Sequence, residues 1–155
     1  GSAAQQGRTG ALDDAAANDG FNLVTQQTAE WNAEKAQQIV QSVIDAGTPF
    51  NVIYAENDDM AKGAVAALDK ANISHGVGKD VIVMGFDCNK WALEELKAGN
   101  WNYDGQCNPF QASYIDDIIK KLENGETISE KTIIMDEKGF DATTITQEDV
   151  DNYGI

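Results

Sequence analysis

The chain has 155 residues, of which 42% are hydrophobic and 24% charged, and this suits one domain with an ordinary core. Twenty-six acidic residues outnumber eleven basic ones, so the formal charge is −15. An acidic surface repels phosphate backbones and anionic lipid headgroups, which argues against nucleic acid and membrane surfaces as partners. No apolar run reaches the roughly 18 residues of a membrane span. Two cysteines, Cys88 and Cys107, are too few for a disulfide scaffold.

Helical and strand patterns alternate from the start of the chain. The segment 2–18 is rich in Ala, Gln and Leu and is typical of a helix that ends at Asp19-Gly20. The short apolar segment 21–24 is expected to form a strand. A second helix is predicted by apolar residues spaced i, i+3, i+4, i+7 and i+8, which are Ala36, Ile39, Val40, Val43 and Ile44.

The middle of the chain carries the strongest strand pattern. A strand at 52–55 is followed at once by a helix from about 57 to 70. The near-continuous apolar run at 81–86 predicts a strand covered on both faces, as parallel strands are. A short helix at 91–96 and a more polar strand at 101–106 follow.

The last third is expected to repeat the same alternation. Pro109 begins a helix that Gly125 ends, and its apolar residues form a stripe that we expect to be buried, namely Ile115, Ile118, Ile119 and Leu122. The segment 133–135 is predicted to be a strand. A terminal helix over 146–153 is expected to be capped by Thr146, with Asp149 three residues on.

Alternation of this kind predicts an α/β fold with right-handed βαβ units and a parallel sheet. The first helical segment has no apolar strand before it, so we expect that this chain begins inside a βαβ unit. Ligands of such sheets lie beyond the carboxyl ends of the strands. Polar or aromatic residues near these ends form a candidate binding set: Arg8, Trp31, Asn57, Asp87 and Gln106. Together they suit a neutral polyhydroxylated ligand, because carboxylate, guanidinium and amide groups bind hydroxyls and indole packs on a sugar ring.

Five segments in order resemble one known family. They are 1–8, 28–32, 54–64 (Tyr-Ala-Glu-Asn-Asp-Asp-Met-Ala-Lys-Gly-Ala), 83–87 (Val-Met-Gly-Phe-Asp) and 106–109 (Gln-Cys-Asn-Pro). Together they resemble the carboxyl-terminal lobe of the type I sugar-binding proteins that serve ABC transporters, such as the ribose- and galactofuranose-binding proteins. Lactose-repressor-type regulators share this fold in their ligand domain.

The resemblance implies a three-layer αβα lobe over residues 1–155, with a carboxyl-terminal tail from about 136. It implies that Arg8, Asn57 and Asp87 bond sugar hydroxyls and that Trp31 packs on the ring. Gln106 or its neighbour would make the last polar contact. It further implies an extracytoplasmic protein, a monosaccharide ligand, an ABC transporter permease as partner, and an amino-terminal lobe absent from this chain. The first strand of the lobe is also missing, and in the family it lies between the strands matching 21–24 and 52–55.

Simpler interpretations remain open for several residues. Asn57 is also a favoured helix N-cap, Arg8 a possible solvated helix residue, and Trp31 a possible core or rim aromatic. The adjacent acids Asp58 and Asp59 are expected to belong to a solvated face rather than a metal site. A disulfide between the two cysteines stays undecided.

Two other functions are weighed against sugar transport. A regulator's ligand-sensing core shares the fold, and a helix-turn-helix in the intact gene product would favour it. A sugar-modifying α/β enzyme needs a base–nucleophile or metal constellation, and His75 is the only histidine. The sequence therefore predicts no catalytic residue, no metal site and no cofactor.

Overall fold

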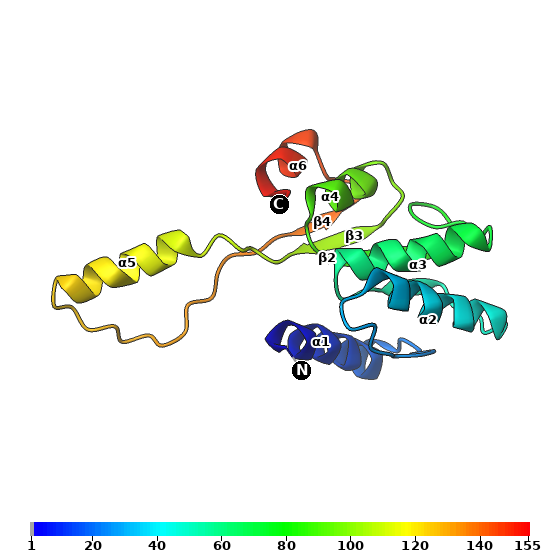
Figure 1. Ribbon diagram of the computed structural model, residues 1–155, viewed down its shortest axis with the longest axis horizontal. Helices are drawn as coiled ribbons and strands as arrows, with labels where there is room; N and C mark the ends of the chain where they lie inside the picture. Colours follow the sequence, from blue (N-terminus) through cyan, green and yellow to red (C-terminus); the bar gives the residue numbers. More distant parts are fainter. Residues whose placement is uncertain (1) are drawn as a thin grey trace.

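A single mostly parallel sheet organises the protein, whose computed structural model describes residues 2–155 (Figure 1). The strands stand in the order β1-β2-β3-β4, with the first three parallel and the last antiparallel. Their bounds are β1 Val52–Tyr54, β2 Ile82–Asp87, β3 Tyr103–Gln106 and β4 Gly139–Asp141. The predicted α/β class with a parallel sheet is confirmed.

Helices connect and flank these strands. Their bounds are α1 Ala3–Asp19, α2 Ala33–Asp45, α3 Asp58–Lys70, α4 Lys90–Lys97, α5 Ala112–Glu123 and α6 Gln147–Tyr153. Ser2 caps α1. The left-handed Gly20 ends the helix, where the sequence predicts its end. No helix within residues 2–155 is long and apolar enough to cross a membrane.

The core lies between one face of the sheet and the helices α3 and α4. Val83 and Gly85 alternate toward this face and are buried. Trp101 fills the space beside them, and its ring meets Trp91 of α4 edge to face at 5.8 Å between centroids. Leu68 of α3 and Leu93 of α4 are fully buried there. Helix α2 packs on the outside of α3.

The opposite face of the sheet is only partly covered. Helix α1 reaches it near the carboxyl ends of the strands, where the Tyr54 hydroxyl donates a hydrogen bond to the Arg8 carbonyl oxygen. At the other end of β2, Ile82 remains 40% exposed. The expectation of a β2 strand covered on both faces is therefore wrong at its amino end, because α1 extends over only one part of that face.

Two predicted strands are absent. The segment 21–24 has no regular structure, and Phe21 is 58% exposed. The segment 133–135 is also irregular, with Ile134 87% exposed. A strand forms only when a neighbour accepts and donates its backbone hydrogen bonds. Neither segment lies beside such a neighbour within the described residues, and β4 forms further on, at 139–141.

Helix α5 projects away from the rest of the molecule (Figure 1). No residue of this helix is buried, and Leu122 is 56% exposed. The apolar stripe predicted from its sequence exists as one face of a helix, but the expectation that it is buried is wrong. Amphipathic spacing predicts a face that needs a partner, and residues 2–155 supply none for this one.

The end of the chain packs firmly on the core. Phe140 of β4 and Val150 of α6 are buried. Thr146 and Asp149 form the predicted capping pair, each side chain bonding the backbone of the other. The last residue, Ile155, exchanges backbone hydrogen bonds with the turn after β2, donating to the Cys88 carbonyl at 3.1 Å and accepting from Lys90 at 3.0 Å. The segment from 136 onward thus includes elements that support this turn.

Candidate ligand-binding site

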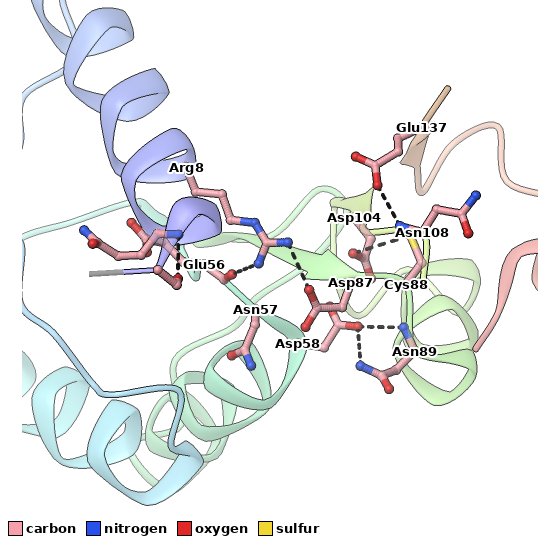
Figure 2. A network of polar contacts seen from close by, with 12 residues as sticks. Arg8, Glu56, Asn57, Asp58, Asp87, Cys88, Asn89, Asp104, Asn108 and Glu137 are labelled. Atoms are coloured by element: carbon pink, nitrogen blue, oxygen red, sulfur yellow. Dashed lines mark hydrogen bonds and ion pairs between the residues drawn. The ribbon is translucent and has the colours of Figure 1, made fainter. Parts of the chain in front are cut away.

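The carboxyl ends of β1, β2 and β3 meet at one edge of the sheet, where Arg8 arrives from α1 (Figure 2). Its Nη2 lies 3.0 Å from Oδ1 of Asp87. Its Nη1 donates to the backbone carbonyl of Glu56, and the guanidinium stacks 4.8 Å from the centroid of the Phe86 ring. The predicted convergence of an arginine and an aspartate from segments 79 positions apart is thus present. A paired guanidinium and carboxylate can each exchange this contact for a ligand hydroxyl.

Asp87 sits in an unusual backbone conformation. Its φ is 116° and that of Cys88 is 62°, both in the region that favours glycine. Such geometry is retained where surrounding contacts enforce it, and it occurs often at binding sites. Burial raises the pKa of the Asp87 carboxyl above its ordinary value, and the facing Arg8 guanidinium partly opposes that rise.

Asn57 follows β1 and begins α3. Its side-chain oxygen accepts a hydrogen bond from the Met60 backbone N–H at 2.9 Å, so the interpretation as an N-cap is confirmed. The cap uses the oxygen and leaves the amide nitrogen able to donate to a ligand.

Gln106 and Trp31 differ in their relation to this edge. Gln106 stands opposite Asp87 in the β2–β3 register, and its side-chain oxygen accepts from the Lys138 N–H at 3.2 Å. Trp31 precedes α2, is exposed, and has φ of 60°. Within the described residues, no hydrogen bond or ring contact joins Trp31 to Arg8, Asp87 or Gln106.

The sequence interpretation missed a buried pair of acids below this edge. Asp58 and Asp104 are both 0% exposed, so the expectation that Asp58 lies on a solvated face is wrong. Asp59 is exposed, as expected. The amphipathic register of α3 was the available signal, because Asp58 shares the buried side of that helix with Ala61 and Leu68.

The two cysteines and the possible metal ligands were the other candidate groups in the sequence. Cys88 is buried, Cys107 is exposed and both are free, so the disulfide left open by the sequence is not formed. Burial raises the pKa of the Cys88 thiol far above its ordinary value, which leaves it unreactive. Among residues 2–155, no three His, Cys, Asp or Glu side chains are grouped to hold a metal ion.

Residues 1–126 match the model of the family described as periplasmic binding protein domain. The chain belongs to this family. The predicted resemblance is confirmed, and among its curated relatives are import binding proteins for sugars.

Two curated relatives illustrate the similarity. A fructose import binding protein of Bifidobacterium longum is 31% identical over 132 residues, which are 84% of this chain and 38% of the relative. A ribose import binding protein of Bacillus subtilis is 32% identical over 81 residues, 52% of this chain and 25% of the relative. The chain therefore spans less than half the length of these relatives.

Solved structures show the same fold. A periplasmic solute-binding protein of an ABC transporter from Actinobacillus succinogenes, with bound D-allose, has a TM-score of 0.76 and 29% identity, covering 96% of this chain and 50% of that one. A galactofuranose-binding protein has a TM-score of 0.79 at 21% identity, covering 94% and 49%. The fold is that of the type I periplasmic binding proteins.

Two substitutions separate the capping role of Asn57 from its predicted role in ligand binding. Asn57→Ala removes the bond to Met60, and we expect the free energy of unfolding to fall by about 1 kcal/mol. Asn57→Asp keeps an oxygen at the N-terminus of α3 and is expected to preserve stability, while it removes the amide donor. Urea unfolding of both variants checks the first effect. Equal stability of Asn57→Ala and the unsubstituted chain would contradict the cap.

Proposed function

We propose that this domain is the carboxyl-terminal lobe of a two-lobed protein that binds a neutral monosaccharide or related polyol and delivers it to an ABC transporter permease. Curated relatives that the chain matches over less than half their length are named import binding proteins for fructose and ribose. The proposed location is extracytoplasmic, in keeping with the family. The proposal includes capture and release of the sugar without chemical change.

The observation that carries the proposal is the Arg8–Asp87 pair at the carboxyl edge of the sheet. Its 3.0 Å contact brings together one group that only donates hydrogen bonds and one that only accepts them. Vicinal hydroxyls do both, so they suit an exchange in which each charged group turns from its partner to the sugar. Asn57 and Gln106 come from the two neighbouring strand ends and add amide contacts, and Trp31 is the proposed ring-packing aromatic.

The exposed apolar surfaces support a second lobe. The stripe of α5 and the segment 133–135 lie outside the packed core, although both are rich in isoleucine. Soluble proteins rarely leave such faces uncovered. We assign both to contacts with the amino-terminal lobe, which would enclose the sugar by hinge closure. Within residues 2–155 the outer side of β1 pairs with no other strand of the sheet, and this edge fits the additional strand that the family resemblance implies.

The names of the relatives also bear on the two alternative functions, a regulator and an enzyme. A regulator would couple sugar binding to DNA binding, and an enzyme would convert the sugar. The import proteins among the relatives favour transport, since they are named as binding proteins.

Calorimetry on the complete gene product tests this function. Titration with a panel of neutral pentoses, hexoses and polyols should show tight binding of at least one, with the sugar recovered unchanged. The 155-residue chain alone should bind the same sugar weakly or not at all, because half of the contacts would come from the other lobe. Turnover of the sugar, or sugar-dependent DNA binding, would replace the proposal by one of the alternatives.

A further inference from the structure

Two carboxyl groups are enclosed directly beneath the candidate site. Asp58 begins α3 and Asp104 lies in β3, and both are completely buried. The strand between them, β2, makes room with Gly85. A methyl group on Gly85 would lie 2.7 Å from Oδ1 of Asp58 and 2.9 Å from the Trp101 ring. The carboxyl group of Asp58 and the Trp101 ring therefore fill the space that a side chain at position 85 would need.

One oxygen of each carboxyl group has a partner and the other has none. Oδ2 of Asp58 accepts from the Asn89 backbone N–H at 2.8 Å and from the Asn89 side chain at 3.0 Å (Figure 2). Oδ1 of Asp104 lies 3.8 Å from the Cys88 sulfur. Oδ1 of Asp58 and Oδ2 of Asp104 have no conventional donor. Asp104 stands opposite Gly85 in the β2–β3 register, and Oδ1 of Asp58 lies against the same glycine, so the two carboxyl groups are neighbours in the buried space beside it.

Two ionised carboxylates in contact would repel each other strongly in a buried site. A single proton removes this repulsion and satisfies both orphaned oxygens at once, because a protonated carboxyl group donates one hydrogen bond. We propose that Asp104 carries this proton on Oδ2 and donates a hydrogen bond through it to Oδ1 of Asp58. Both acids thereby act as positioning residues that hold the turn containing Asp87.

The link to Asp87 runs through the turn 87–89. The ionised Asp58 accepts two hydrogen bonds from Asn89, two residues after the strained Asp87. Ile155 also holds this turn, through its backbone hydrogen bonds with Cys88 and Lys90. These contacts enforce the left-handed conformations at Asp87 and Cys88. The shared proton therefore keeps the acceptor charged and aimed at the turn that presents Asp87 to a ligand.

The groups around the pair favour protonation of Asp104 over protonation of Asp58. Burial, the Asp58 carboxylate and Asp87 all raise the pKa of Asp104, whose value is about 9. Burial also raises the pKa of Asp58, but less, because hydrogen bonds from Asn89 favour its charged form. Cys88 faces Asp104 as a neutral thiol. Arg8 bonds Asp87, and no ion pair within residues 2–155 joins a cation to either acid of the pair.

The proton has a consequence for stability. The unfolded chain releases the Asp104 proton near pH 4, whereas the folded chain keeps it up to about pH 9. Between these values the folded state binds one more proton, so its stability falls as the pH rises. The unfolding equilibrium constant should increase by up to about tenfold per pH unit from this group.

The first test uses the 155-residue chain and needs no ligand. Carboxyl carbon NMR of the labelled chain at pH 7 should show one buried carboxyl group still protonated, and Asp104→Asn should remove that signal. Asp104→Asn should also flatten the pH dependence of unfolding, measured in urea from pH 5 to 8. Asp117→Asn, at an exposed position of α5, is the matched control and should leave both unchanged.

Absence of a protonated carboxyl signal at pH 7 in the unsubstituted chain would overturn the shared proton, whether or not Asp104→Asn folds. A second variant, Asp58→Asn, removes the neighbouring charge and should move the titration of Asp104 to lower pH. An unmoved titration would show that the two groups are not coupled, against the proposal.

The positioning role rests on the proposed function and is tested in the complete gene product. Asp58→Ala should weaken sugar binding about tenfold, as expected for a lost bond to a charged group. Asp58→Asn retains an oxygen for Asn89 and should restore most of the affinity. Equal affinity of Asp58→Ala and the unsubstituted protein would overturn the positioning role. Failure of any sugar to bind would instead contradict the proposed function and leave the NMR result standing.

Discussion

Replacing Asp87 with asparagine in the complete gene product is expected to weaken monosaccharide binding about a hundredfold. The carboxylate can accept two charge-assisted hydrogen bonds from sugar hydroxyls, each worth about 1.5–3 kcal/mol when the alternative is an unpaired buried group. Asparagine retains one acceptor and tolerates the left-handed backbone found at this position, where φ is 116°. The loss should therefore appear in the binding constant, measured by calorimetry, rather than in stability.

The choice of asparagine matters because alanine would confuse two effects. A side chain without polar atoms is strained at this φ and also leaves Arg8 without its 3.0 Å partner. Asp45→Asn is the matched control, since Asp45 is exposed at the end of α2 and, within residues 2–155, its carboxylate accepts a side-chain hydrogen bond only from Gln41. An affinity within threefold of the unsubstituted protein for Asp87→Asn would remove Asp87 from the proposed site.

Local patterns predicted most elements of the core correctly. The helix at 57–70 and the strand at 81–86 appear as α3 and β2, and the capping pair of Thr146 and Asp149 is present. These elements depend on side chains close in sequence, such as the Asn57 cap. The failures share a different cause. The segments 21–24 and 133–135 have strand-like residues, but a strand also depends on a distant neighbour, which no local pattern reveals.

In the candidate site, too, some features followed from the sequence pattern and others depended on contacts between distant segments. Parallel topology placed Asp87 and Gln106 at one edge, because the carboxyl ends of parallel strands coincide. Composition suggested that Asp58 was solvated, and this was wrong. The burial of Asp58, in helix α3, depends on Asp104 of β3 and on the space left by Gly85 of β2. Such a site is defined by three segments at once, and the amphipathic register of α3 was the one sign of it within a single segment.

Placing aspartate at both Ile115 and Ile119 is expected to destabilise the complete gene product by about 3–6 kcal/mol while changing the isolated chain by less than about 0.5 kcal/mol. In the isolated chain both side chains are about half exposed on the projecting α5, so little burial is lost there. Against an amino-terminal lobe, each isoleucine would bury a side chain worth about 1.5–3 kcal/mol. Urea unfolding of the two proteins gives the comparison.

The loss of unfolding free energy in the complete protein, minus the loss in the isolated chain, measures the contact between α5 and the other lobe. Any intrinsic effect of aspartate on the helix propensity of α5 occurs in both proteins and cancels. A paired exchange on the polar face, Asp117→Lys with Lys121→Asp, keeps the net charge and serves as the control. It should leave both proteins within about 0.5 kcal/mol of their parents. Equal destabilisation of the isolated chain and the complete protein by the isoleucine substitutions would contradict the assignment of α5 to the other lobe. The apolar stripe would then require a partner outside this gene product.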